Sequence, residues 1–143
     1  MHVHDWIALQ RTILYEVAEA QMKAIHQTLS RKGQTRMNEK GASLHAEELR
    51  VRVRRHKDRY LLIEWLIRRW SRQDGSARFA THSLRKGRGD RFSRAVLARH
   101  ARQEDLPAVL EAETVFADCR RRTRLLNDLE RKLAEAGYER PVP

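Results

Sequence analysis

The chain has 143 residues, of which 30 are Lys or Arg and 19 are Asp or Glu, so its net charge is +11. This length fits one domain with a buried core, and apolar residues that recur with regular periods argue against intrinsic disorder. The single cysteine excludes an internal disulfide, and no Cys/His cluster has the spacing of a zinc site.

The positive charge is concentrated in the middle third of the chain. Residues 50–102 hold 17 Lys and Arg against four Asp and Glu. A local excess of this size says more about binding partners than about the fold. We therefore predict a nucleic-acid-binding face on a small sheet in this window, held by two long and nearly neutral helices.

The first predicted element is a helix over residues 5–31. Asp5 is a suitable N-cap, and the apolar residues that follow recur at helical spacing. Their stripe is broad enough to need a partner. It consists of Ile7, Leu9, Ile13, Leu14, Val17, Ala20, Ala24, Ile25 and Leu29. Residues 32–46, which are polar, basic and almost free of aliphatic side chains up to Ser43, are predicted to form a mobile linker.

Residues 47–84 are predicted to form a three-stranded antiparallel meander. In residues 47–55, apolar Leu49, Val51 and Val53 alternate with arginines, which is the period of a strand with one solvated face. That solvated face is expected to carry only arginine, namely Arg50, Arg52 and Arg54.

Two further strands complete the predicted meander after a short turn at residues 56–58. Residues 59–72 can be read as a strand or as a helix, but their aromatic and β-branched content favours a central strand. Asp74-Gly75 is a hairpin signal, and the residues after it alternate again.

The C-terminal part is predicted to be helical after a flexible basic loop at residues 86–90. A short helix over residues 93–103 starts at Ser93, and a long helix over residues 105–136 has Pro107 in its first turn and Gly137 as its stop. Residues 138–143 are expected to fray. The long helix should pack on the first one, with the sheet covering the remaining apolar surface, which gives an α+β fold of order α–βββ–α–α in a single domain, residues 1–143.

The arginine row is the most informative candidate site. Alternate residues of a strand lie about 6.6–6.8 Å apart, close to the distance between successive phosphates of one nucleic-acid strand. A guanidinium group is also suited to bidentate phosphate contact. The alternative is a solvated edge whose cations prevent pairing with other sheets.

Two neighbouring features extend this candidate interface. The loop at residues 86–90 combines cations with glycines that let the backbone approach a phosphate, although an ordinary connector is an equal alternative. Trp70 is the best candidate for stacking on bases, but aromatic residues in a small sheet are more often core. The predicted contacts are Arg50, Arg52, Arg54, Arg55, Lys57, Arg68, Arg69, Trp70, Arg72, Arg78, Arg85, Lys86, Arg88 and Arg91.

Catalysis is not expected, and no cofactor or metal is predicted. His82 with Asp74 or Asp90 is the only candidate for a general base and its orienter, and no spacing rule supports it. Cys119 lies on the apolar stripe of the last helix and should be inert core. The arginine cluster of that helix, residues 120–124, is expected to form intrahelical ion pairs.

The layout of residues 59–125 resembles the MobI-type accessory proteins of integrative conjugative elements. A hydrophobic strand with Trp65 leads to a basic segment at residues 85–89, then to a short helix and a long helix. The long helix carries Glu111, Glu113, Phe116 and Ala117 ahead of Arg120. The resemblance implies DNA as the ligand and a relaxase as a protein partner, and no catalytic residues follow from it.

Other functions and an oligomer stay open at this point. An RNA-binding protein would be equally basic, and an inhibitor could use its basic face to occupy a nucleic-acid site on its target. The longest apolar run, residues 60–67, is too short for a bilayer, and no signal peptide is visible, so we expect a cytoplasmic protein that binds no membrane. A residual helical stripe also predicts a homodimer.

Overall fold

The computed structural model describes residues 2–39, 45–73 and 76–138, and the side chains of residues 2–29, 47–69 and 78–138 among them. Three helices and three strands follow one another in the order α–βββ–α–α, so the predicted α+β fold is confirmed. The elements are α1 (Val3–Glu39), β1 (His45–His56), β2 (Tyr60–Gln73), β3 (Ser76–Ser83), α2 (Arg94–His100) and α3 (Leu106–Glu135).

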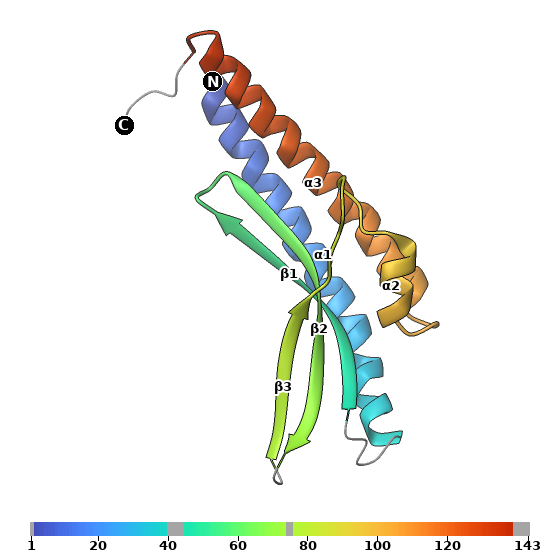
Figure 1. Cartoon of the computed structure of the whole chain (residues 1–143). Helices are drawn as coiled ribbons and strands as arrows, with labels where there is room; N and C mark the ends of the chain where they lie inside the picture. Colours follow the sequence, from blue (N-terminus) through green and yellow to red (C-terminus); the bar gives the residue numbers. More distant parts are fainter. Residues whose placement is uncertain (1, 40–44, 74–75, 139–143) are drawn as a thin grey trace.

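The two long helices, α1 and α3, lie side by side and run in opposite directions (Figure 1). Near the chain ends, His4 Nε2 donates to the backbone carbonyl of Tyr138 at 3.0 Å. Further along, the guanidinium group of Arg11 donates to Asn127 at 2.7 Å and to Glu130 at 3.1 Å. The predicted packing of the first helix on the last is therefore confirmed.

Helix α1 is longer than predicted, because it begins at Val3, which places the expected N-cap Asp5 inside the first turn, and continues to Glu39 instead of ending at residue 31. The prediction of a linker over residues 32–46 is wrong for residues 32–39 and for residues 45–46, where β1 begins. Residues 32–39 lack an apolar stripe, but most of them are good helix formers and none is proline. Residues 40–44 lie outside the described part of the chain.

The sheet is the predicted meander, with β2 in the centre and both pairings antiparallel. The ambiguous segment at residues 59–72 is a strand from residue 60 onward, and β2 continues to Gln73. Residues 57–59 connect the paired His56 and Tyr60, and Lys57 and Asp58 both have positive φ, 54° and 56°, within the turn that the Arg59 amide closes by donating to the His56 carbonyl at 3.2 Å. The predicted turn at residues 74–75 lies outside the described residues, between the paired Gln73 and Ser76.

The core lies between one face of the sheet and the two long helices (Figure 1). Trp65 at its centre is completely buried, and its ring meets that of Phe116 edge-on at 5.7 Å. Strands and helices both supply core residues. In a strand, alternate residues share a face, and in a helix every third or fourth residue does. Core members from the sheet are Leu49, Val51, Ile63 and Ile67, and those from the helices include Ile7, Leu14, Ile25, Val109 and Ala112.

The C-terminal helices have the predicted signals at their ends. The side chain of Ser93 accepts a hydrogen bond from the backbone of Val96 at 3.1 Å and caps α2, which ends at His100 instead of residue 103. Helix α3 stops where Gly137 has a φ of 90° and the Tyr138 amide donates to Leu133 at 2.8 Å. The predicted frayed tail lies, except for residue 138, outside the described residues.

Candidate nucleic-acid interface

The arginine row of β1 lies on the face of the sheet that points away from the helices, as predicted. Arg50, Arg52 and Arg54 alternate with the core residues of the same strand. The face is not purely arginine, however, because Glu48 and Glu64 share it. This part of the prediction is wrong, since the register of β1 with β2 places Glu64 directly opposite Arg52.

Each arginine of this row has an acidic partner. Arg50 pairs with Glu48 at 3.3 Å. Glu64 pairs with both Arg52, at 3.2 Å, and Arg54, at 2.7 Å. Burial alone would raise the pKa of Glu64, but hydrogen bonds from Arg54, Ser83 and Arg52 hold that pKa below its ordinary value. Glu64 therefore stays ionised and neutralises part of the row.

Aromatic residues on the sheet divide between the core and the surface. Trp65 is buried, whereas the rings of Tyr60 and Phe79 are about half exposed. The guanidinium group of Arg68 lies 5.3 Å from the centre of the Phe79 ring. The side chains of Trp70 and Arg72, both predicted contacts, lie outside the described residues.

Other predicted contacts point elsewhere, because successive residues of a strand alternate between the two faces. Arg55 lies on the helix side, with its guanidinium group 5.3 Å from the ring of Tyr15 in α1. Arg69 pairs with Glu47 at 3.6 Å. Lys57, in the β1–β2 turn, and Arg78, on β3, are exposed. The predicted set thus does not form one continuous face of the sheet.

The basic loop after β3 contacts α3 through its last residue, Asp90. The carbonyl of Asp90 accepts from Arg120 at 2.9 Å, and its carboxylate pairs with Arg124 at 3.0 Å. The hydrogen bond from Arg124 holds the pKa of Asp90 below its ordinary value, although burial acts slightly in the opposite direction.

Hydrogen bonds within the loop add to its contacts with α3. The amine of Lys86 donates to the carbonyls of Gly87 and Gly89, both of which have positive φ, 81° and 88°. Glycine adopts that conformation without strain. The loop therefore has a defined path that presents its remaining side chains to solvent.

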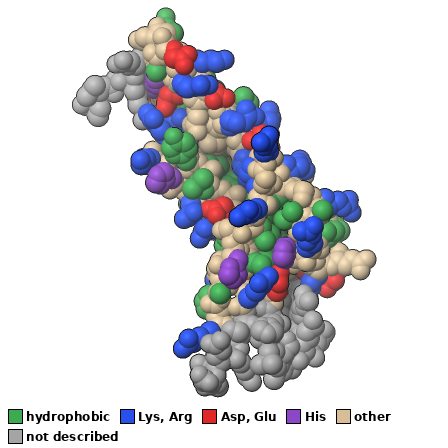
Figure 2. Space-filling view, viewed as in Figure 1, with side chains coloured by type: hydrophobic (Ala, Val, Ile, Leu, Met, Phe, Trp, Pro, Cys, Tyr) green, Lys and Arg blue, Asp and Glu red, His purple; other side chains and the backbone are tan. Residues whose placement is uncertain are grey.

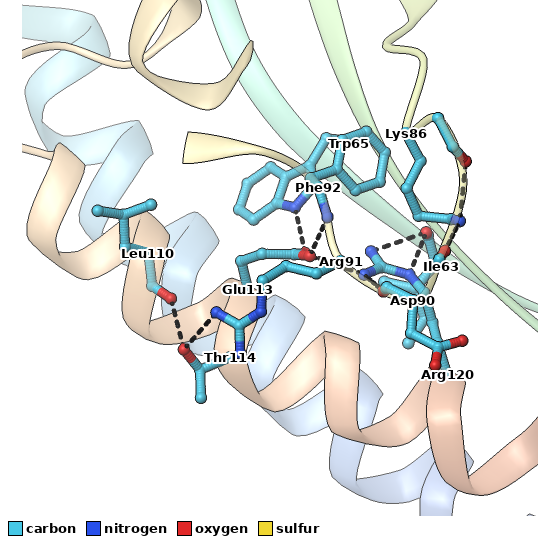
Figure 3. A network of polar contacts seen from close by, with 12 residues as sticks. Ile63, Trp65, Lys86, Asp90, Arg91, Phe92, Leu110, Glu113, Thr114 and Arg120 are labelled. Carbon is cyan, nitrogen blue, oxygen red and sulfur yellow. Dashed lines mark hydrogen bonds and ion pairs between the residues drawn. The ribbon is translucent and has the colours of Figure 1, made fainter. Parts of the chain in front are cut away.

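A buried polar network supports the loop from below (Figure 3). Glu113 is 1% exposed and accepts hydrogen bonds from the indole of Trp65 at 2.9 Å, the amide of Phe92 at 2.7 Å and the guanidinium group of Arg120 at 2.8 Å. Arg120 also donates to the carbonyl of Ile63 in β2 at 3.1 Å. One ion pair of α3 thus connects β2, the loop and the helix.

The intrahelical pairs predicted for the arginine cluster of α3 are confirmed at three of its four positions. Arg120 pairs with Glu113, and Arg121 and Arg122 both pair with Asp118. Arg124 instead contacts Asp90 of the loop. Sequence reasoning missed that contact because the two residues lie 34 positions apart.

Cations of the loop and of both ends of α2 have no acidic partner among the described side chains. Among the described side chains, no ion pair joins any of these cations to a carboxylate. Arg85 and Arg88 are exposed, and Arg91 donates to the hydroxyl of Thr114 at 3.4 Å. In Figure 2, Lys and Arg side chains are spread over the coloured part of this face. The members of the set are Arg85, Lys86, Arg88, Arg91, Arg94 and Arg99, called the loop cations below.

Other chemistry has little support among the described residues. Cys119 is 2% exposed, so its expected place in the core is confirmed, and burial raises its pKa to about 11, which disfavours the reactive thiolate. The carboxylate of Asp90, a candidate orienter for His82, is engaged by Arg124, and Asp74 lies outside the described residues. The described part of the chain has no group of His, Cys, Asp and Glu that could hold a metal ion. No described helix is long and apolar enough to cross a membrane.

A protein-family model described as MobI protein matches residues 14–134 of this chain. No curated protein and no solved structure matches. The residues on which the resemblance rested include Trp65, Glu113, Phe116 and Arg120, which the fold brings together in the buried network and the adjoining core.

Proposed function

Because the matching model covers most of its length, the chain belongs to the MobI family, and we propose that it is a DNA-binding accessory protein of conjugative mobilisation. The contact with DNA is made mainly by the loop cations. The arginine row of β1 adds a second and weaker contact. Its partner Glu64 also accepts a hydrogen bond from Ser83, so the polar contacts of the row extend to β3.

The observation that supports this proposal is that the arginines of β1 pair with carboxylates, whereas the loop cations do not among the described side chains. A guanidinium group that already pairs with a carboxylate gains less from a phosphate, because the pair must open or share its charge. Arg85 and Arg88 have no such partner among the described residues and stand on an ordered loop. An ordered loop loses less conformational entropy when it binds.

A binding role is proposed here in preference to catalysis. Phosphate contacts require only cations and backbone amides in fixed positions, and the loop supplies both. The strand cleavage that mobilisation requires is assigned in this proposal to a separate relaxase, which is the protein partner we propose.

A salt titration of two matched double variants tests the proposal. Arg85→Gln with Arg88→Gln removes two loop cations, and we expect a loss of affinity for a duplex DNA oligonucleotide. The slope of log K against log salt should become shallower by about 2, since each phosphate contact contributes roughly 0.9. Fluorescence anisotropy between 50 and 200 mM salt measures both quantities.

The control changes the net charge equally at a different place. Arg121→Gln with Arg122→Gln removes two cations that pair with Asp118 on α3. We expect its slope to stay within about 0.5 of the wild-type slope. Equal effects of both pairs would show that diffuse charge does the binding and would refute the loop as the contact. Tighter binding of single-stranded RNA than of DNA at matched length would refute DNA as the ligand.

A further inference from the structure

Helix α1 carries two apolar stripes, and only one of them is buried. The buried stripe faces α3 and the sheet and contains Ile7, Leu14, Ala18, Ile25 and Leu29. The second stripe is exposed over several turns, with side chains that are 37–45% accessible. Its large members are Val3, Trp6, Leu9, Ile13 and Val17, and Ala20 continues it.

The exposed stripe faces away from the sheet. Tyr15 and His26 of α1 contact β1, through the Arg55 side chain and the Val51 amide. Helical spacing places Ile13 roughly on the opposite side of the helix from these residues. Leu125 and Leu129 of α3 are also exposed, on the side of that helix away from Glu113 and Arg120. The sheet therefore cannot cover these side chains.

A stripe of this size is unusual for a monomer. Single exposed apolar residues are normal, but contiguous ones, with a tryptophan among them, mark an interaction surface. Within the described part of the chain, no element packs over Trp6, Leu9, Ile13 and Val17.

We propose that the stripe pairs with the same stripe of a second copy of the chain, antiparallel and about a two-fold axis at Ile13. In that register Ile13 meets Ile13, Leu9 lies opposite Val17, and Trp6 lies opposite Ala20. The large indole thus faces the smallest side chain of the stripe, as close packing of two helices requires. The proposal does not depend on nucleic-acid binding.

Charges beside the stripe favour the same orientation. Asp5 and Lys23 lie on one flank of the stripe, at its opposite ends, and both are exposed, although Lys23 also pairs with Glu19 of its own helix at 3.1 Å. Antiparallel pairing brings Asp5 of one copy near Lys23 of the other. In a parallel two-fold pair this flank of each copy would lie on opposite sides of the contact, so Asp5 would not meet Lys23 of the other copy. A two-fold contact of this kind uses the same patch on both subunits.

Light scattering across a concentration series tests the dimer. At micromolar concentration we expect the wild type to have about twice the chain mass of 16.9 kDa. Ile13→Glu puts two carboxylates on the axis and should give a folded species of 16.9 kDa, with a circular dichroism spectrum like that of the wild type. Leu62→Glu on the outer sheet face is the control, because Leu62 is 40% exposed and Ile13 is 41% exposed. It should remain dimeric.

Charge reversal and cross-linking test the register. Asp5→Lys should raise the dissociation constant at low salt, and adding Lys23→Asp should restore it. Ile13→Cys should form a disulfide-linked dimer under mild oxidation, whereas Val3→Cys should not, since antiparallel pairing holds the two copies of residue 3 far apart. The native Cys119 does not interfere because it is buried.

Each result decides for or against the dimer. A wild type of 16.9 kDa at every concentration up to 100 µM, or an Ile13→Glu variant that stays dimeric, overturns the proposal. If Val3→Cys cross-links as readily as Ile13→Cys, the antiparallel register is wrong. Should Ile13→Glu fail to fold, the cysteine pair and the charge reversal, which leave the core intact, decide the question.

Discussion

At the scale of single residues, Glu113 does more for this fold than any surface ion pair. Its carboxylate accepts hydrogen bonds from the Trp65 indole and the Phe92 amide, and Trp65 is 48 residues away in the chain. Arg120 balances its charge and donates onward to β2. A buried pair of this kind stabilises little beyond what an apolar pair would, but removing one partner leaves the other uncompensated.

Glu113→Gln should therefore destabilise the protein strongly. The amide keeps the shape of the side chain but removes the charge opposite Arg120 and turns an NH₂ group toward existing donors. We expect a loss of about 3–5 kcal/mol in the free energy of unfolding. Urea denaturation measures it, with Glu111→Gln, an exposed neighbour on α3, as the control expected to stay within about 0.5 kcal/mol. Equal effects of the two variants would contradict this account.

His26 makes the stability of the fold depend on pH. Its Nε2 accepts a hydrogen bond from the amide of Val51 at 3.0 Å, which only a neutral imidazole can do. Burial, together with the cations Arg50 and Arg68, lowers the pKa of His26 below its ordinary value of 6.5. The unfolded chain therefore binds the proton more tightly than the folded chain does.

The free energy of unfolding should decrease as the pH falls through 6.5, the pKa of His26 in the unfolded chain. Stability from this group is complete above that pH and is lost progressively until the pKa of the folded state is passed. In His26→Gln the amide oxygen can accept from Val51 without titrating. Urea denaturation at pH 7.5 and 5.5 should show a larger decrease for the wild type, and parallel pH profiles would argue against His26 as the cause.

At the scale of elements, the pairing of β1 with β2 changes what the arginine pattern of β1 indicates. Its three arginines at period two are typical of a phosphate-binding row. The carboxylate of Glu64, which β2 places opposite Arg52, holds Arg52 and Arg54 against the sheet. The row is therefore partly neutralised before any ligand arrives.

Glu64→Gln should release the row and tighten DNA binding. Two guanidinium groups lose their anionic partner, so the slope of log K against log salt should steepen by about 1–2. The partly exposed pair contributes little to stability, so the change in the free energy of unfolding should stay below about 1 kcal/mol. Anisotropy titrations measure the slope, with Glu135→Gln, the same charge change at the end of α3, as the control. Weaker binding would mean that Glu64 positions the arginines for the phosphates.

At the scale of the whole molecule, one core joins the helices and the sheet. Its cluster contains residues of α1, β1, β2, α2 and α3, and the Glu113 network connects the loop to it. Neither long helix buries its apolar stripe without the other, and the sheet lacks a second layer of its own. Unfolding should therefore be a single cooperative event.

Urea unfolding followed by two probes tests this cooperativity. Circular dichroism at 222 nm reports mainly α1 and α3, and tryptophan fluorescence in a Trp6→Phe, Trp70→Phe background reports Trp65 in the sheet. We expect the two midpoints to coincide within about 0.2 M, with slopes of roughly 1–3 kcal/mol per M. Separate midpoints would show that the helical pair is stable without the sheet.

The sequence alone determined features that depend on near neighbours along the chain. Apolar residues at helical spacing predicted both long helices, strict alternation predicted β1, and Ser93 and Gly137 marked helix ends, because these signals act over one or two turns. The charge excess of residues 50–102 is likewise a property of composition. The end of α1 was missed, since residues 32–39 form helix without an apolar stripe.

Only the tertiary structure decided which charges are free and which apolar surface is covered. Glu64 meets Arg54 because of the β1–β2 register, and Arg124 meets Asp90 because the loop crosses α3. Which stripe of α1 stays exposed depends on which faces of that helix α3 and the sheet cover. Contacts of this kind join residues far apart in the chain, so packing and register, not local pattern, establish them.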